Sequence, residues 1–293
     1  MQIEQGTTTA NGLEIGYLSC GADGPLALLL HGFPDSAHTW RHLLPVLAEA
    51  GYRAVAPWLR GYAPTALDTE GRYQNGACVM DAIGLHDALG GDGDAVIVGH
   101  DWGARIATGA AVLEPDRWKK VVTMAVPPAG AVAGAFFTYA QLQRSWYMFF
   151  FQHPLSDMVV GMNDLEFIDH LWADWSPGHE AGADLGHVKD ALRDPANLAA
   201  AIAYYRATIG GVGLVPELQA AEDAIGGTPP QPHLYLHGRT DGCMGAEVAE
   251  GVGVFLTSPG SKAVIVEGAG HFLQLERPDE VNRLVLEHLT ASV

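Results

Sequence analysis

One aspartate, Asp101, stands between Gly99 and Gly103, directly after an apolar run and directly before an alanine-rich one. Small residues two positions to either side allow a strand to turn sharply into a helix, which leaves the central side chain exposed above a sheet. The backbone amide of the next residue, Trp102, then lies at a helix start, where it can donate a hydrogen bond to an oxyanion. The same pattern is typical of an aspartate that caps a helix. By itself it therefore predicts either a nucleophile or an N-cap.

Two later residues favour the nucleophile. Asp241 follows the apolar run 234–237, and His271 follows the apolar run 263–267. A nucleophile at such a turn predicts the chain order nucleophile, acid, histidine, with each partner after a later strand. Parallel strands deliver such loops to the same edge of a sheet. We therefore predict a catalytic triad in which Asp101 attacks, His271 is the base and Asp241 orients the histidine.

The elements that must position these residues alternate along the chain. The turn residues Asn11-Gly12 predict a hairpin over the first twenty residues. Alternating strands and helices predict an α/β fold with a mostly parallel central sheet and helices on both faces. The expected strands are 26–30, 52–57, 95–98, 121–124, 234–236 and 263–266, and the expected helices are 37–50, 77–89, 104–113, 198–209 and 278–290.

The pattern changes between residues 129 and 215, where no convincing strand is found and aromatic residues are frequent. We therefore expect a core formed by residues 1–128 and 216–293, interrupted by a helical cap, residues 129–215. Phe33, directly after the first parallel strand, is expected to supply a second oxyanion amide beside that of Trp102. With this fourth element, nearly the whole chain resembles the α/β-hydrolase fold.

Composition excludes several function classes. The chain has 293 residues and a net charge of −18 with histidine neutral. An acidic surface repels phosphate backbones and anionic lipids, so we expect no nucleic-acid or membrane partner. Three cysteines without a CxxC pair favour a reducing, cytoplasmic setting over a disulfide scaffold. The N-terminal residues lack the pattern of a signal peptide, and no apolar stretch predicts a transmembrane helix.

An aspartate nucleophile restricts the reaction. A carboxylate is a poor nucleophile toward acyl carbonyls, but it can displace a leaving group from saturated carbon and form an alkyl ester of the enzyme. Water activated by His271 would then hydrolyse that ester at Asp101. The substrate is therefore expected to contain an epoxide or a carbon–halogen bond. An opening epoxide needs an acidic hydroxyl to protonate its oxygen, whereas a departing halide needs only hydrogen-bond donors.

The residues of the expected cap resemble those of the soluble epoxide hydrolases. That family carries a ring-opening tyrosine just before an aromatic-Phe-Gln-x-Pro stretch, and the segment 146–154 matches with Tyr147 in this position. A second tyrosine precedes an arginine late in the cap, which selects Tyr205 rather than Tyr204. The resemblance implies an epoxide hydrolase that forms vicinal diols, with both tyrosines holding and protonating the epoxide oxygen.

Two other hypotheses stay open at the level of sequence. Fluoroacetate dehalogenases resemble the chain but place arginine directly after the nucleophile and again three residues later; here Trp102 takes the first position and only Arg105 is present. Haloalkane dehalogenases share the Asp-Trp step but usually carry asparagine at the position of Phe33. A ligand-binding protein that kept the fold is the third hypothesis, although no triad element is missing.

The expected substrate is a small apolar epoxide, and the sequence leaves a homodimer open. No metal is expected, because His38 and His42 have metal-compatible spacing but no evident carboxylate or cysteine partner. No nucleotide-binding loop is present, so no organic cofactor is expected either. Seven aromatic, imidazole and proline side chains are expected to line the substrate pocket: His31, Pro34, Trp146, Phe150, His153, Trp172 and Phe272.

Overall fold

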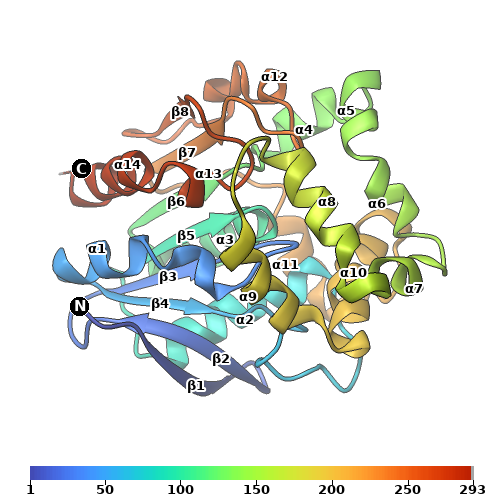
Figure 1. Cartoon of the computed structure of the whole chain (residues 1–293). Coiled ribbons are helices and arrows are strands. Elements are labelled where there is room, and N and C mark those ends of the chain that lie inside the picture. Colours follow the sequence, from blue (N-terminus) through green and yellow to red (C-terminus); the bar gives the residue numbers. More distant parts are fainter. Residues whose placement is uncertain (292–293) are drawn as a thin grey trace.

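Eight strands form one sheet in the order β1-β2-β4-β3-β5-β6-β7-β8 (Figure 1). The computed structural model describes residues 1–291. β1 pairs with β2 and β2 with β4 in antiparallel orientation, while every other neighbouring pair is parallel. The strands are β1 (Glu4–Ala10), β2 (Leu13–Cys20), β3 (Leu26–Leu30), β4 (Arg53–Pro57), β5 (Val96–His100), β6 (Lys120–Met124), β7 (His233–Gly238) and β8 (Lys262–Val266).

The central strands are buried on both faces. Every residue of β3, β5, β6 and β7 is buried, as expected for parallel strands that helices cover on both sides. Their register brings the carboxyl ends to one level, because Leu30 pairs with Gly99 and Met124 pairs with both His100 and Leu236. The loops that follow these strands therefore meet at one edge of the sheet. This confirms the predicted α/β fold with a mostly parallel sheet.

Two groups of helices cover the sheet (Figure 1). Helices α1 (Leu43–Glu49) and α14 (Pro278–Thr290) pack together on one face, and α2 (Asn75–Ala88), α3 (Trp102–Leu113) and α11 (Gln219–Ala224) pack together on the other. The short helices α12 (Ala246–Ala249) and α13 (Leu273–Glu276) follow β7 and β8. Short 3-10 turns occupy 37–40, 115–117, 162–164, 216–218 and 252–255.

The prediction of one continuous helix over 37–50 is wrong. A 3-10 turn, Ala37–Trp40, ends before α1 begins at Leu43. Pro45 explains the break, because it has no amide hydrogen to donate to the carbonyl of Arg41 and its ring would clash with that carbonyl in a continuous helix. His38 and His42 therefore do not lie on one helix, and the His38 ring instead stacks on His187 with ring centroids 3.7 Å apart.

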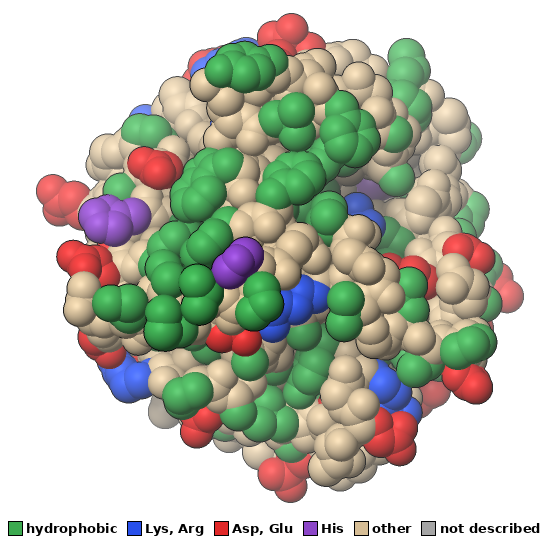
Figure 2. All heavy atoms as spheres, turned by 90° about the vertical axis from the view of Figure 1, so that its right-hand side faces the viewer, with side chains coloured by type: hydrophobic (Ala, Val, Ile, Leu, Met, Phe, Trp, Pro, Cys, Tyr) green, Lys and Arg blue, Asp and Glu red, His purple; other side chains and the backbone are tan. Residues whose placement is uncertain are grey.

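Residues 129–215, called the helical segment below, contain helices and no strand within the described chain. They lie beyond the carboxyl ends of the parallel strands, at right in Figure 1. Figure 2 shows that apolar side chains gather on this face of the molecule. Over residues 1–291, no helix has the length and apolar character needed to cross a bilayer. The helices are α4 (Ala129–Ala135), α5 (Tyr139–Arg144), α6 (Trp146–Phe150), α7 (Ser156–Gly161), α8 (Glu166–Trp175), α9 (Gly182–Leu192) and α10 (Pro195–Gly210).

The turn between β5 and α3 depends on the absence of two side chains. A Cβ atom at Gly99 would overlap the carbonyl group of Gly103, and a Cβ atom at Gly103 would overlap the carbonyl oxygen of Leu30. The clashing atoms are backbone and cannot move aside without shifting β3 or α3. The two glycines thus allow α3 to start directly against the end of the sheet.

We expect Gly103→Ala to destabilise the protein by about 3 kcal/mol or more, because the added methyl group overlaps buried backbone. Gly134→Ala is the matched control, since this glycine lies in α4 with no atom near its missing Cβ. The control should be neutral or slightly stabilising, because alanine favours helix over glycine by roughly 0.5–1 kcal/mol. Thermal and urea unfolding measure both; equal stability of the two variants would contradict the close approach.

Candidate active site

Asp101 occupies a strained backbone position at the end of β5. Its φ is +55° and its ψ is −117°, a region that non-glycine residues rarely adopt. The side chain does not cap α3. Its Oδ1 atom instead accepts a hydrogen bond of 2.8 Å from the backbone amide of Phe33. The geometry is therefore that of a nucleophile turn and not of an N-cap.

Two backbone amides are available for an oxyanion at Asp101. The Phe33 amide already contacts the carboxylate, and Trp102 is the first residue of α3. The first amides of a helix have no partner within that helix and carry its partial positive charge. These two amides come from the loop after β3 and the start of α3, as the sequence predicts. Negative charge that develops at the Asp101 carboxyl group can be stabilised from both sides.

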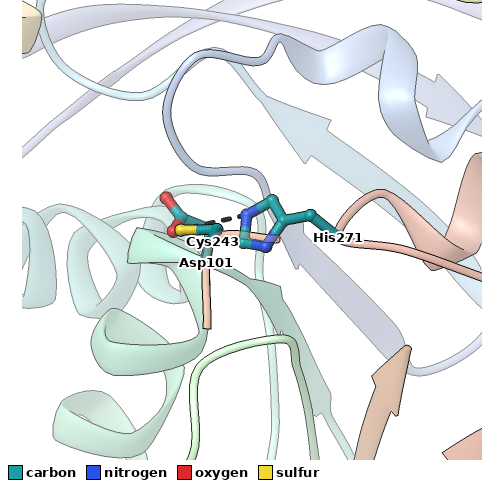
Figure 3. Close-up of side chains that lie close together, drawn as sticks. All are labelled: Asp101, Cys243 and His271. Atoms are coloured by element: carbon teal, nitrogen blue, oxygen red, sulfur yellow. Dashed lines mark ion pairs between the residues drawn. The ribbon is translucent and has the colours of Figure 1, made fainter. Parts of the chain in front are cut away.

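His271 lies between two carboxylates. Its Nδ1 atom is 3.0 Å from Oδ2 of Asp241, and its Nε2 atom is 3.7 Å from Oδ2 of Asp101. Figure 3 shows the imidazole directed at the Asp101 carboxylate, with the Cys243 thiol beside it. The second oxygen of Asp241 accepts hydrogen bonds from the amides of Cys243 (2.7 Å) and Met244 (2.9 Å). The two amides thus hold Oδ1 of Asp241 in place, and Oδ2 orients the His271 imidazole.

The two carboxylates change the protonation of the imidazole. Burial by itself would lower the pKa of His271, but the negative charges of Asp241 and Asp101 outweigh this effect and raise the pKa to about 10. Burial would likewise raise the pKa of Asp241, but the charged His271 lowers it below its usual value. A positive His271 therefore lies between the Asp241 and Asp101 carboxylates, and its Nε2–H points toward Asp101 without forming a short hydrogen bond.

The helical segment holds the loops that carry the triad. The backbone carbonyl of Trp175, at the end of α8, accepts hydrogen bonds of 3.0 Å from the amides of both Gly242 and His271. The buried side chain of Gln141, in α5, donates to the carbonyl of Cys243 and accepts from the amide of Gly245. The loops after β7 and β8 are thus tied to the helices that cover them.

A cavity of about 190 Å³ opens above Asp101. The hydroxyl-bearing side chains of Tyr147 and Tyr205 line it, whereas the hydroxyl of Tyr204 donates to the carbonyl of Arg60 and does not line it. Burial raises the pKa of Tyr147 and of Tyr205 well above the usual value, so both phenols stay protonated and can donate. The apolar part of the wall consists of Val126, Val132, Phe136, Met148, Ile209 and Met244.

The seven side chains expected to line the pocket do not line this cavity, and four of them belong to the packing around it. His31 is fully buried and its Nε2 accepts a hydrogen bond from the amide of Leu59. The Trp172 indole donates to the carbonyl of Pro34 and stacks on Phe272 with centroids 3.6 Å apart. These contacts pack the helical segment onto the loops of the sheet.

Of the other three, Trp146 and His153 lie on the outer side of the helical segment, and Phe150 is half-buried within it. Trp146 is 47% exposed, and His153 is exposed as well. Phe150 stacks on Phe167 with centroids 5.8 Å apart. Tyr147 is buried next to the exposed Trp146 because neighbouring residues of a helix point in different directions. The aromatic composition of this stretch did not reveal which face of α6 turns inward.

Several cavity residues were not predicted from the sequence. Thr208 and Ile209 lie three and four positions after Tyr205 in α10, and Arg105 lies four positions after Asp101. Helical spacing places such residues on the same face, so this signal could have identified them. Cys243 also lines the cavity, and its thiol is hydrogen-bonded to the Tyr147 hydroxyl (3.4 Å).

One group within residues 1–291 has ligand atoms close enough together for a metal ion: Asp101, Cys243 and His271, within 4.8 Å of one another (Figure 3). Metal ligands must be deprotonated. Burial and the nearby negative carboxylates of Asp241 and Asp101 raise the pKa of the Cys243 thiol well above its usual value, and His271 is protonated below about pH 10. The donor set is therefore poorly suited to a metal.

Known proteins resemble the chain over almost its full length. The profile of the alpha/beta hydrolase fold family matches residues 25–278. Epoxide hydrolase A of Mycobacterium tuberculosis is 30% identical over 314 residues, which cover 96% of this chain and 95% of that protein. Epoxide hydrolase 4 of Mus musculus is 30% identical over 285 residues, covering 94% and 76%. The solved structure of an epoxide hydrolase from an endophytic Streptomyces superposes with a TM-score of 0.78 at 29% identity, covering 98% and 95%.

The position of His271 between two charges predicts a measurable titration. Asp101→Asn removes one of the negative groups that raise the pKa of His271, so this pKa should fall from about 10 by roughly one to three pH units. NMR titration of the labelled imidazole measures the change. Asp92→Asn, at an exposed position before β5, is the control and should leave the titration unchanged. An unaltered pKa in Asp101→Asn would show that Asp101 carries no charge beside His271.

Proposed function

We propose that this chain, which belongs to the alpha/beta hydrolase fold family, is an epoxide hydrolase that converts an epoxide and water to a vicinal diol through an ester on Asp101. One observation carries the proposal. A carboxylate lies at the nucleophile turn, and two tyrosine hydroxyls line the cavity above it. Phenols supply the proton that an opening epoxide needs and that a departing halide does not.

In the first step, a carboxylate oxygen of Asp101 attacks one epoxide carbon. The new carbon–oxygen bond forms as the epoxide carbon–oxygen bond breaks, and the alkoxide takes a proton from Tyr147 or Tyr205. Oδ1 is held by the Phe33 amide and Oδ2 faces His271, so the carboxylate is oriented before the substrate arrives. The product is a hydroxyalkyl ester of Asp101 beside a tyrosinate.

Ester formation itself prepares the second step. The Asp101 charge disappears when the ester forms, so one of the groups that raise the pKa of His271 is lost. The imidazole then passes its proton to the tyrosinate, which restores the phenol. The neutral Nε2 can then take a proton from water.

Hydrolysis then restores the enzyme. Hydroxide from that water adds to the carbonyl carbon of Asp101, and the amides of Phe33 and Trp102 stabilise the oxyanion. The tetrahedral intermediate expels the diol oxygen, which takes the proton held by His271. The carboxylic acid left on Asp101 returns its proton to His271, which restores the resting ion pair. The sum is one epoxide and one water converted to one diol.

The ester can be trapped in His271→Gln, which lacks the base for the second step. We expect intact-mass spectrometry of this variant, mixed with epoxides and organohalides, to show adducts that add the whole mass of an epoxide. A second change, Asp101→Asn, should abolish them, provided that deamidation to aspartate is excluded by peptide mapping. Adducts equal to an organohalide less its hydrogen halide would instead identify a dehalogenase. A panel with no adduct and no turnover would contradict the proposed function.

The tyrosines are tested by a matched set of variants. Tyr147→Phe and Tyr205→Phe should each lower kcat for epoxide opening, and the double variant should lose about a hundredfold or more, because general-acid catalysis contributes roughly 10²–10⁴. Tyr204→Phe removes a hydroxyl bonded to Arg60 outside the cavity. It should reduce stability without a comparable loss of kcat. Full activity of the double variant would exclude both phenols as proton donors.

A further inference from the structure

Arg105 differs from the other arginines of the described chain. Each of the others is bonded to a carboxylate or to a backbone carbonyl group. Within residues 1–291, Arg105 forms no ion pair or hydrogen bond, and its Nε atom is buried without a partner. A partly desolvated cation without a counter-ion is unfavourable unless a ligand supplies one.

The side chain lines the same cavity as the proposed nucleophile. Arg105 lies four residues after Asp101, about one turn along α3, and its guanidinium carbon is 5.7 Å from the centre of the Trp102 ring. Apolar side chains form most of the surrounding wall. A ligand bound above Asp101 would therefore meet a cation on the cavity wall, in addition to the positive His271 that two carboxylates already balance.

Neither nearby carboxylate neutralises this cation directly. Glu222 and Asp101 act on Arg105 at a distance, and burial still lowers the pKa of the guanidinium. Arginine stays protonated in proteins at neutral pH, so the positive charge persists. Glu222 accepts a hydrogen bond of 2.6 Å from the amide of Gly76 in α2, and Asp101 loses its charge during the proposed reaction. The site thus contains a cation, Arg105, that is balanced by less negative charge once the ester forms.

We propose that the epoxide substrate carries a carboxylate a few atoms from the oxirane ring, and that Arg105 binds this group and so selects the substrate. The inference rests on the proposed function, which it narrows from epoxides in general to epoxy acids with an apolar chain. A planar carboxylate matches the guanidinium fork. A cavity of about 190 Å³ accommodates a small acid of this kind.

The test compares 5,6-epoxyhexanoate with 5,6-epoxyhexanamide, which has the same shape without the charge. In the native enzyme, kcat/KM should be higher for the acid. Arg105→Leu should reduce the acid-to-amide ratio by about ten- to a hundredfold, as expected for loss of a charged hydrogen-bonded pair. Arg105→Lys, which keeps the charge without the planar fork, should give an intermediate ratio.

Arg193→Leu is the matched control. It removes the same charge from an exposed arginine in the loop before α10, which is paired with Asp164 and Asp190. This variant should keep the ratio of the native enzyme. If Arg105→Leu does not fold, inhibition of the native enzyme by hexanoate and by hexanamide replaces it, with the acid expected to inhibit more strongly.

The outcomes separate this inference from the proposed function. Turnover of the amide at least as fast as the acid, equal inhibition by the two hexanoyl compounds, or an unchanged ratio in Arg105→Leu would overturn the role of Arg105. In each case the proposal that the protein hydrolyses epoxides would be unaffected. An absence of diol from these probes and from the wider epoxide panel would overturn the proposed function itself.

Discussion

A buried histidine held between two carboxylates is the interaction on which the rest of the structure depends. Asp241, His271 and Asp101 are all buried, and their charges would be costly there if any one were unpaired. The fold stabilises the two carboxylates with hydrogen bonds donated by backbone amides. The Phe33 amide donates to Asp101, and amides of the loop after β7 donate to Asp241. The level carboxyl ends of the parallel strands bring these loops together.

The helical segment covers the cavity and also holds the loops of Asp241 and His271 in place. The Trp175 carbonyl binds the amides of the acid loop and of the histidine loop together, so a displacement of α8 would move two triad residues at once. α10 supplies Tyr205 to the cavity and directs the hydroxyl of its neighbour Tyr204 to the backbone of Arg60. The shape of the cavity and the positions of Asp241 and His271 therefore depend on the same packed helices.

Charge is distributed unevenly in this acidic protein. A chain with a net charge of −18 keeps most of its arginines paired, yet within residues 1–291 Arg105 has no partner and lies in an apolar cavity next to a carboxylate. His271 is the second cation near Asp101, but two carboxylates balance it. The two cations therefore differ in that His271 is balanced by carboxylates and Arg105 is not.

The strand order along the chain, the turn at Asp101 and the residues after β7 and β8 could be predicted from the sequence, because these depend on local patterns of glycines and apolar runs. The preference for Tyr205 over Tyr204 came from the resemblance to the soluble epoxide hydrolases, through the adjoining Arg206. Which aromatic side chains face the cavity depends on tertiary packing, since Tyr147 and Trp146 are neighbours with opposite exposure. The position of the Cys243 thiol beside Asp101 likewise depends on how the loop after β7 folds and not on any pattern near Asp101.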